Sequence, residues 1–265
     1  MKRIRLYLIL IFFIACTSTQ NLLKIQFAPN PVIAHRGAFK KNNFPENSIA
    51  ALREAIRLQC TGSEFDVRMS ADDTLLINHD PHYEKLEIEK TSYQQLSKVS
   101  LSNGETLPTL RQYLLAGLKD NNHTRLVVEI KPSEISKERG KLIAEKAVRL
   151  VEDLKAENMV VYISFDYDIL KTIRAVNSRA TVQYLNGDRS PRQLKEDRID
   201  GVDYHLSVFK KFPDWISMAK ENGIILNAWT VNTREDMQWL LDNNFNFITT
   251  NEPELLLSFK IKNPQ

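Results

Sequence analysis

Glycine and cysteine are scarce in this chain, and their scarcity narrows the class of protein. Only 8 of the 265 residues are glycine, and no glycine-rich loop of the kind that cradles nucleotide phosphates is present. This disfavours a nucleotide-binding enzyme on an open, doubly wound sheet. Of the two cysteines, Cys16 ends a signal-like N-terminal segment and Cys60 follows a predicted helix. We therefore expect no disulfide and expect Cys60 to be a small buried core residue.

The N-terminal apolar run is too short to cross a bilayer. Leu6–Ala15 has about ten residues, whereas a membrane-spanning helix needs ~20. Basic residues precede the run and Cys16 follows it, so residues 1–16 are predicted to be an export signal peptide. Phe13-Ile14-Ala15-Cys16 is similar to a bacterial lipobox, which predicts lipidation at Cys16. The alternative is a plain secretory signal that is cleaved nearby.

This segment sets the expected location and the net charge. The formal charge of +3 falls to zero when the signal is removed, because residues 1–15 contain Lys2, Arg3 and Arg5 but no acidic residue. Nothing in the charge balance favours nucleic-acid binding. We expect an exported lipoprotein at a periplasmic or cell-surface membrane face, or otherwise a secreted or periplasmic protein. Membrane contact is expected only through the lipid anchor at the end of a tether, residues 17–30, and the oligomeric state stays open.

Strands and helices alternate from Val32 onward without a sign of a domain break. The predicted strands are Val32–His35, Glu64–Met69, Arg125–Ile130, Met159–Ser164, Thr181–Tyr184, Val202–His205, Ile224–Thr230 and Phe247–Thr250. The predicted helices are Ser48–Gln59, Leu110–Leu118, Ile135–Lys155, Asp168–Val176, Pro191–Asp197, Pro213–Asn222, Arg234–Asn243 and Pro253–Lys260. Eight strand–helix units predict an α/β fold, a single-domain TIM (β/α)8 barrel over residues 31–265, since such barrels typically have about 250 residues. An open sheet is the competing architecture.

One region interrupts the alternation. Residues 80–124 follow a short extra strand, Leu75–Ile77, and form an insertion after the second barrel strand that ends in a helix. In a barrel, a loop at this point lies over the C-terminal mouth, where active sites gather.

The strand around Glu64 places two carboxylates on one face. Side chains alternate across a strand, so Phe65 and Val67 share one face while Glu64, Asp66 and Arg68 share the other. Burying two like charges together is unfavourable unless a cation lies between them. A hard divalent ion prefers such oxygen ligands. A solvated strand face or an ion pair with Arg68 would also account for the pattern.

The next strand repeats this arrangement. Its apolar residues Leu126, Val128 and Ile130 alternate with an inward-facing set that includes Glu129 and Lys131. Glu129 is thus predicted to be a third carboxylate at the mouth of the barrel. The strand near residue 227 similarly turns Asn227 and Trp229 inward, and Trp229 either fills the barrel or contacts substrate.

With these residues placed, the chain resembles the glycerophosphodiester phosphodiesterase family. The matching elements are His35-Arg36-Gly37, Pro45-Glu46-Asn47-Ser48, Glu64-Phe65-Asp66-Val67, His79-Asp80, Glu129-Ile130-Lys131 and Trp229-Thr230-Val231-Asn232. They occur in the family's order over about residues 32–253. The chain departs at Ser48, where threonine is common, and at Thr249-Thr250-Asn251, where a Thr-Asp pair is more usual. The insertion after His79 is on the short side for the family.

The resemblance implies a TIM barrel that binds one divalent cation, Ca²⁺ or Mg²⁺, and hydrolyses glycerophosphodiesters to glycerol 3-phosphate and an alcohol. It implies that Glu64, Asp66 and Glu129 hold the metal. It also implies the remaining roles: an acid/base pair formed by His35 and His79, and phosphate-binding Arg36 and Lys131. The attacking group is either water or the glycerol 2-hydroxyl.

Two alternatives keep the fold but change the function. A lipid-anchored enzyme could act on membrane lysophospholipids, and a lipoprotein of this fold could bind phosphodiesters without cleaving them. We assign no role to His82, His123 or His205. Glu46 is predicted to satisfy backbone donors at the start of the first helix rather than to act in catalysis.

Overall fold

The computed structural model describes residues 24–259. The predicted signal peptide, Cys16 and the first part of the predicted tether lie outside the described residues. The described part of that tether contacts the barrel, since the backbone N–H groups of Gln26 and Ala28 donate to the carbonyls of Asn122 and His123.

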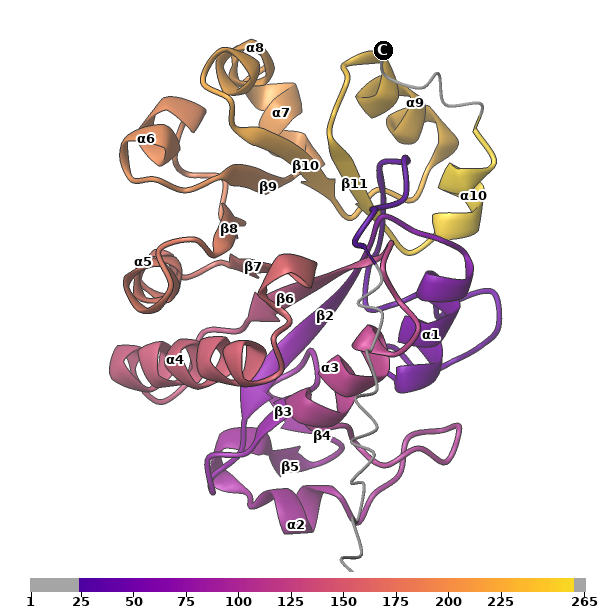
Figure 1. Ribbon diagram of the computed structural model, residues 1–265, viewed down its shortest axis with the longest axis vertical. Helices are drawn as coiled ribbons and strands as arrows, with labels where there is room; N and C mark the ends of the chain where they lie inside the picture. The colour runs from indigo at the N-terminus through magenta and orange to yellow at the C-terminus, as the bar shows by residue number, and fades with distance from the viewer. Residues whose placement is uncertain (1–23, 260–265) are drawn as a thin grey trace, which may run out of the picture.

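Eight parallel strands close into a barrel (Figure 1). They are β1 (Val32–Ala34), β2 (Gly62–Met69), β6 (Arg125–Ile130), β7 (Val160–Ser164), β8 (Thr181–Tyr184), β9 (Gly201–His205), β10 (Ile225–Trp229) and β11 (Phe247–Thr250). Strand β1 pairs with both β11 and β2, and this double pairing closes the ring. The predicted TIM barrel is therefore confirmed, and the open sheet is excluded.

Helices surround the strands. They are α1 (Ile49–Arg57), α3 (Leu110–Leu118), α4 (Lys137–Asp153), α5 (Tyr167–Val176), α6 (Pro191–Glu196), α7 (Leu206–Lys211), α8 (Asp214–Glu221), α9 (Arg234–Asp242) and α10 (Pro253–Leu257). All but α7 match a predicted helix. Helix α7 and the 3-10 turn η2 (Glu157–Met159) are too short to show a hydrophobic period, which is why the sequence did not predict them. Between residues 24 and 259, no helix is both long and apolar enough to cross a membrane.

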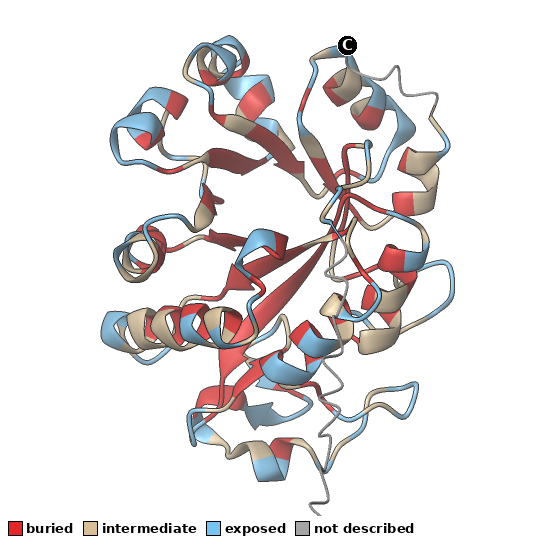
Figure 2. Cartoon of the chain, in the orientation of Figure 1, coloured by how far each residue is buried: buried red, intermediate tan, exposed pale blue. Residues whose placement is uncertain are grey.

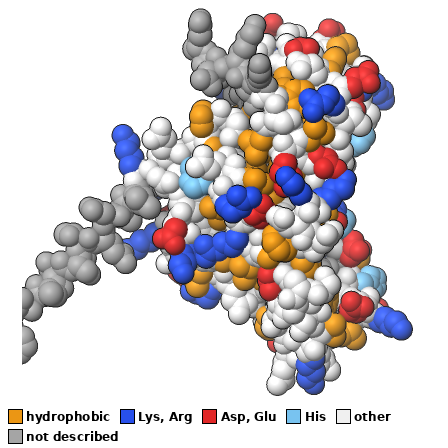
Figure 3. Space-filling model, turned by 90° about the vertical axis from the view of Figure 1, so that its right-hand side faces the viewer, with side chains coloured by type: hydrophobic (Ala, Val, Ile, Leu, Met, Phe, Trp, Pro, Cys, Tyr) orange, Lys and Arg blue, Asp and Glu red, His pale blue; other side chains and the backbone are white. Residues whose placement is uncertain are grey.

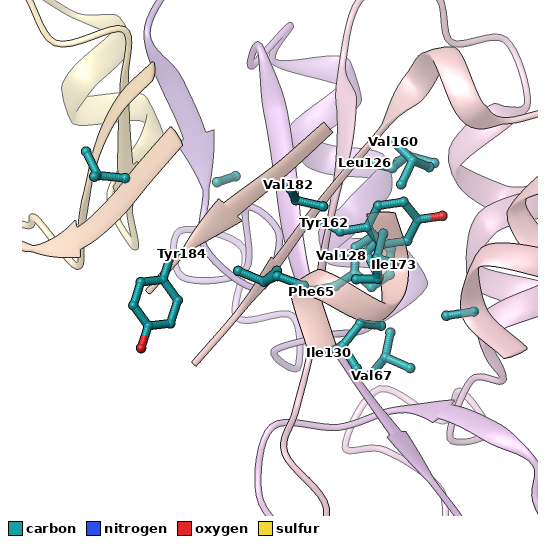
Figure 4. Packing of buried hydrophobic residues seen from close by; sticks show 14 of the residues in the cluster. Phe65, Val67, Leu126, Val128, Ile130, Val160, Tyr162, Ile173, Val182 and Tyr184 are labelled. Carbon is teal, nitrogen blue, oxygen red and sulfur yellow. The ribbon is translucent and has the colours of Figure 1, made fainter. Parts of the chain in front are cut away.

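Two hydrophobic layers hold the barrel together. The strands are buried almost throughout, whereas the helices are buried on one side (Figure 2). Between strands and helices, outward-facing side chains such as Phe65, Val67 and Val128 form the main core (Figure 4). A smaller cluster fills the interior of the barrel and comprises Ile33, Val127, Val161, Ile163 and Leu185. Full burial of such a side chain stabilises the fold by about 1.5–3 kcal/mol. The predicted alternation of strand faces is thus what the structure shows.

The insertion has a small core of its own. Strand β3 (Leu75–Ile77) pairs antiparallel with β2 and leads into β4 (His82–Tyr83), β5 (Leu86–Glu87), the 3-10 turn η1 (Ile88–Lys90) and α2 (Tyr93–Leu96). Its apolar residues are Leu76, Tyr83, Ile88, Leu96 and Leu107. Most of it extends away from the barrel (Figure 1). Glu89 anchors it, because its carboxylate accepts from Ser133 Oγ at 2.8 Å, the Glu134 N–H at 2.7 Å and Arg139 Nε at 3.0 Å.

The face of the molecule in Figure 3 carries basic and acidic side chains interspersed with one another. Cys60 is buried, as predicted.

Candidate active site

Three carboxylates from β2 and β6 meet inside the barrel mouth. Asp66 and Glu129 are partners in the parallel register of these strands, and Glu64 lies two residues before Asp66. One oxygen of each of the three groups lies within 4.8 Å of the others. All three side chains are buried, with residue exposures of 1%, 0% and 6% for Glu64, Asp66 and Glu129.

The charge of this cluster is incompletely balanced. Lys131 Nζ lies 2.8 Å from Asp66 Oδ1 and 2.6 Å from Glu129 Oε1. Glu64 Oε1 has no hydrogen-bond partner among residues 24–259. The Arg36 guanidinium also lies near the cluster, with its Nε 3.7 Å from Asp66 Oδ2, but it is shared with Glu46. One ammonium group and part of one guanidinium therefore face three carboxylates. Oxygen ligands gathered in this way fit a hard divalent cation, so these residues can hold a metal ion.

Burial and mutual repulsion also shift the pKa values of these three carboxyl groups. Burial, followed by the charges of Asp66 and Glu129, raises the pKa of Glu64 well above its usual range. Burial and the Asp66 charge raise the pKa of Glu129 to about 7. Burial acts in the same direction on Asp66, but the Lys131 and His79 charges and the hydrogen bonds from Lys131 and Asn47 together outweigh it, and the pKa of Asp66 falls to about 2.

Asn47 holds Asp66 in place. Its Nδ2 donates to Asp66 Oδ2 at 2.8 Å, and its Oδ1 accepts from the Asp66 backbone N–H at 3.2 Å. Asn47 has a positive φ of 60°, a left-handed conformation that asparagine tolerates better than most residues. In the sequence, Asn47 is part of a motif, and nothing next to it indicates that it positions Asp66.

The turn after β1 places His35 and Arg36 at the same site. His35 Nδ1 lies 2.7 Å from Asn251 Oδ1, and its Nε2 lies 3.9 Å from Glu64 Oε2. The Arg36 N–H donates to Glu64 Oε2 at 2.8 Å. Gly37 is required in this turn, because its φ is +81° and a Cβ there would lie 2.6 Å from the backbone carbon of Ala51. Burial and the Arg36 charge lower the pKa of His35 to about 4.

His79 follows β3, which pairs with β2 at the mouth. Its Nδ1 lies 2.7 Å from Asp80 Oδ1, and its backbone carbonyl accepts from Arg68 Nε at 2.8 Å. Arg68 thus fixes the chain at His79 and does not neutralise Glu64 or Asp66 directly. Partial burial lowers the pKa of His79.

These groups border one cavity of about 110 Å³. Its polar side comprises His35, Arg36, Glu64, His79, Glu129 and Lys131. Its opposite side is largely apolar and comprises Ile163, Phe165, Leu185 and Trp229, together with Asp203. The structure therefore brings all of the predicted site residues together, with Asp66 just behind the cavity wall.

Trp229 belongs to both the barrel filling and the cavity. Its Nε1 donates to the Asp203 backbone carbonyl at 2.8 Å. Its ring packs edge-to-face against Phe165, with centroids 5.4 Å apart. A second cavity of about 230 Å³ shares Arg36 and His79 and is bordered by the first residues of the insertion, including Asp80 and Tyr83.

The prediction for Glu46 is wrong. Its Oε2 lies 2.5 Å from Arg36 Nη1, so it pairs with the guanidinium. The backbone donors at the start of α1 are satisfied by Ser48, whose Oγ accepts from Ala51, and by Glu105, whose oxygens accept from Ile49 and Ala50 at 2.8 and 3.0 Å. Glu105 belongs to the insertion, and nothing local in the sequence identifies it as this cap.

Two further residues belong to the site although no motif in the sequence indicates them. Asn251 stands where the family pattern usually has aspartate, and it orients His35. Asp203 points inward, since strand alternation places it between the outward-facing Val202 and Tyr204.

Comparison with known proteins gives consistent matches. The model of the "Glycerophosphoryl diester phosphodiesterase family" matches residues 35–255. A glycerophosphodiester phosphodiesterase of Caldanaerobacter subterraneus subsp. tengcongensis is 29% identical over 86% of this chain and 96% of its own length. The crystal structure of a glycerophosphodiester phosphodiesterase from Parabacteroides distasonis is 38% identical, with a TM-score of 0.83, and the match covers 88% of this chain and 97% of that one. An Oleispira antarctica phosphodiesterase has been solved in complex with the product sn-glycerol-3-phosphate. It is 23% identical to this chain with a TM-score of 0.70, and the match covers 88% of this chain and 96% of that one.

Proposed function

Because the chain belongs to the glycerophosphoryl diester phosphodiesterase family, we propose that it hydrolyses glycerophosphodiesters to glycerol 3-phosphate and an alcohol. The observation that carries this proposal is the meeting of a buried carboxylate cluster and two imidazoles at one cavity. The family's named activity supplies the reaction, and this geometry supplies each group that the reaction needs.

Glu64, Asp66 and Glu129 would hold one divalent cation, either Ca²⁺ or Mg²⁺. When bound there, the ion supplies positive charge toward the non-bridging oxygens of the phosphodiester. The protein adds two cationic side chains beside the cluster. Arg36 and Lys131 border the cavity and are placed to bind the phosphate and to offset the charge that builds up on it.

The two histidines divide the proton transfers. His35 is neutral near pH 7 because its pKa is lowered to about 4. Its Nδ1 faces the Asn251 carbonyl oxygen, so Nδ1 carries the proton and Nε2 is free to accept one. His35 is therefore assigned as the base toward water or the glycerol 2-hydroxyl. His79 borders both cavities, and the Asp80 carboxylate 2.7 Å from its Nδ1 favours the imidazolium against the effect of partial burial on its pKa. His79 is therefore assigned as the acid that protonates the departing alcohol.

We also propose that the protein is exported and anchored by a lipid on Cys16. The basic N-terminus, the short apolar run and the lipobox-like Phe13–Cys16 support this. Mass spectrometry of the full chain, expressed in a bacterium and recovered from its membranes, tests it: a lipid-modified Cys16 as the first residue is expected. A mature chain that starts elsewhere and carries no lipid would overturn it.

A panel of glycerophosphodiesters tests the activity, with glycerol 3-phosphate release as the readout and each metal supplied in turn. EDTA is expected to abolish turnover. His35→Ala and His79→Ala are each expected to lower kcat by about 10²–10⁴-fold, as is typical for loss of a general acid or base. His123→Ala is the matched control, because His123 Nε2 bonds the Ile56 carbonyl away from the cavity.

Full activity in both active-site variants would end the proposal. Comparing glycerophosphocholine with lysophosphatidylcholine in the same assay separates soluble diesters from membrane lysolipids. Tight binding of both without product would instead indicate a binding protein.

A further inference from the structure

The catalytic cavity contains one buried carboxyl group that the proposed chemistry does not use. Asp203 lies in the middle of β9 and is only 1% exposed. It borders the same cavity as His35, Glu64 and Glu129. Its Oδ1 has no hydrogen-bond partner among residues 24–259.

Such an oxygen is unfavourable for the fold by itself. An unpaired buried polar group loses its hydration without compensation, and an apolar side chain of similar shape in its place is neutral or stabilising. Asn227 stands opposite Asp203 on β10, and a hydrogen bond from its side chain to the carboxyl group partly offsets the rise in the pKa of Asp203. Oδ1 itself stays without a partner among residues 24–259. Asp203 borders the cavity, so a ligand bound there would lie next to its carboxyl group.

The surroundings of Asp203 define what could bind it. Trp229, Phe165 and Leu185 form an apolar wall on this side, and the Trp229 indole is held by the backbone carbonyl of Asp203 itself. The cationic groups, Arg36 and Lys131, lie with the carboxylate cluster on the polar side. A phosphate therefore belongs on the polar side, and a carbon skeleton that carries a hydroxyl fits the Asp203 side.

The protonation state of the Asp203 carboxyl group favours a neutral ligand. Burial, and then the Glu129 charge, raise the pKa of Asp203 well above its usual range. A protonated carboxyl has both a donor and an acceptor, as a hydroxyl does. A protonated carboxyl and a hydroxyl can therefore hydrogen-bond each other. A second anionic group would not be bound favourably here.

We propose that Asp203 hydrogen-bonds a hydroxyl of the glycerol half of the substrate and so selects glycerol over alcohols that lack it. This inference rests on the proposed phosphodiesterase function. The glycerol carbons lie along Trp229 while the phosphate is bound by Arg36 and Lys131. The departing alcohol leaves on the His79 side.

Product binding tests this directly, because glycerol 3-phosphate contains the glycerol half alone. We compare it, by calorimetry with Ca²⁺ or Mg²⁺ present, with propane-1,2-diol 1-phosphate and propane-1,3-diol phosphate, each of which lacks one hydroxyl. The wild-type protein is expected to bind at least one analogue about tenfold or more weakly than glycerol 3-phosphate, as for loss of a hydrogen bond to a buried group.

Substitutions identify the group responsible. Asp203→Leu is expected to weaken glycerol 3-phosphate binding by about tenfold and to bind all three phosphates alike, without a lower melting temperature. Asp203→Asn keeps a donor and an acceptor and is expected to retain most of the discrimination. If the leucine variant does not fold, Asp203→Ala is measured in its place with the same expectation.

Three results would overturn the inference. The wild-type protein could bind all three phosphates equally, or the leucine or alanine variant could keep the discrimination. The variant could also change the preference among departing alcohols while glycerol 3-phosphate binding stays constant. Failure of the wild-type protein to hydrolyse any glycerophosphodiester would be a different outcome and would refute the proposed function itself.

Discussion

Replacing Glu129 by glutamine is expected to stabilise the metal-free protein while removing its response to metal. Glu129 is buried beside Asp66 and Glu64, and its pKa is raised from 4.5 to about 7. A carboxyl with a higher pKa in the folded than in the unfolded protein binds its proton more tightly when folded. Its stabilising contribution is therefore present below about pH 4.5 and is lost as the pH rises to about 7.

The size of the effect follows from this shift. The change from 4.5 to about 7 corresponds to about 3 kcal/mol of lost stability above pH 7. Glutamine has the same shape and no charge. Lys131 also has Asp66 as a partner, 2.8 Å away, and this pair does not involve Glu129. We expect Glu129→Gln to be more stable than the wild-type protein by about 1–3 kcal/mol in EDTA at pH 8, which raises Tm by roughly 2–4 °C per kcal/mol.

Addition of metal is expected to remove most of the stability advantage of the variant. A ligand at 100 times its Kd stabilises a folded protein by about 2.7 kcal/mol, so millimolar Ca²⁺ or Mg²⁺ is expected to raise the Tm of the wild-type protein. The variant lacks one of three ligands and should respond weakly or not at all. Thermal unfolding with EDTA and with metal, at pH 8 and pH 5.5, measures both effects, and the advantage of the variant in EDTA should shrink at pH 5.5.

Glu89→Gln is the matched control, since Glu89 is also buried but its carboxylate is fully paired with Ser133, Glu134 and Arg139. This control should be less stable than the wild-type protein and should keep the metal response. The reasoning is refuted if Glu129→Gln melts below the wild-type protein in EDTA at pH 8, or if metal stabilises both equally.

Two further predictions concern residues that orient the site. Asn251→Asp places a carboxylate 2.7 Å from His35 Nδ1, which favours the imidazolium and raises the pKa of His35. The acidic limb of the kcat/KM profile should therefore move to higher pH, and an unchanged limb would argue against His35 as the base. Glu105→Ala leaves the N–H groups of Ile49 and Ala50 without their acceptor and should lower stability by about 1–2 kcal/mol in urea unfolding. An unchanged midpoint would show that water replaces the carboxylate.

Regular alternation made much of this protein predictable. The two-residue period of β2 and β6 separated Phe65 and Val67 from Glu64 and Asp66, and it put Glu129 on the same side. Each predicted barrel strand is found with ends that differ by at most two residues. The strands could be predicted because a barrel strand must bury one face against helices. That face therefore carries apolar residues at alternate positions of the strand's own sequence.

Contacts between distant segments were not predictable in this way. Asn251 meets His35 across 216 residues, and Glu105 caps a helix 56 residues before it. Short elements inside the insertion and helix α7 also lacked a period long enough to detect.

Asp203 illustrates the difference between what the local sequence determines and what only the tertiary structure determines. Its inward direction is fixed locally, by the outward-facing Val202 and Tyr204 on either side. The absence of a partner for its Oδ1 among residues 24–259 is not fixed locally, because it depends on which side chains the neighbouring strands bring next to it. The sequence by itself determined which face of each strand is apolar. Only the closed barrel decided which polar groups meet across it, because a side chain's direction is a local property of the backbone and its partner is not.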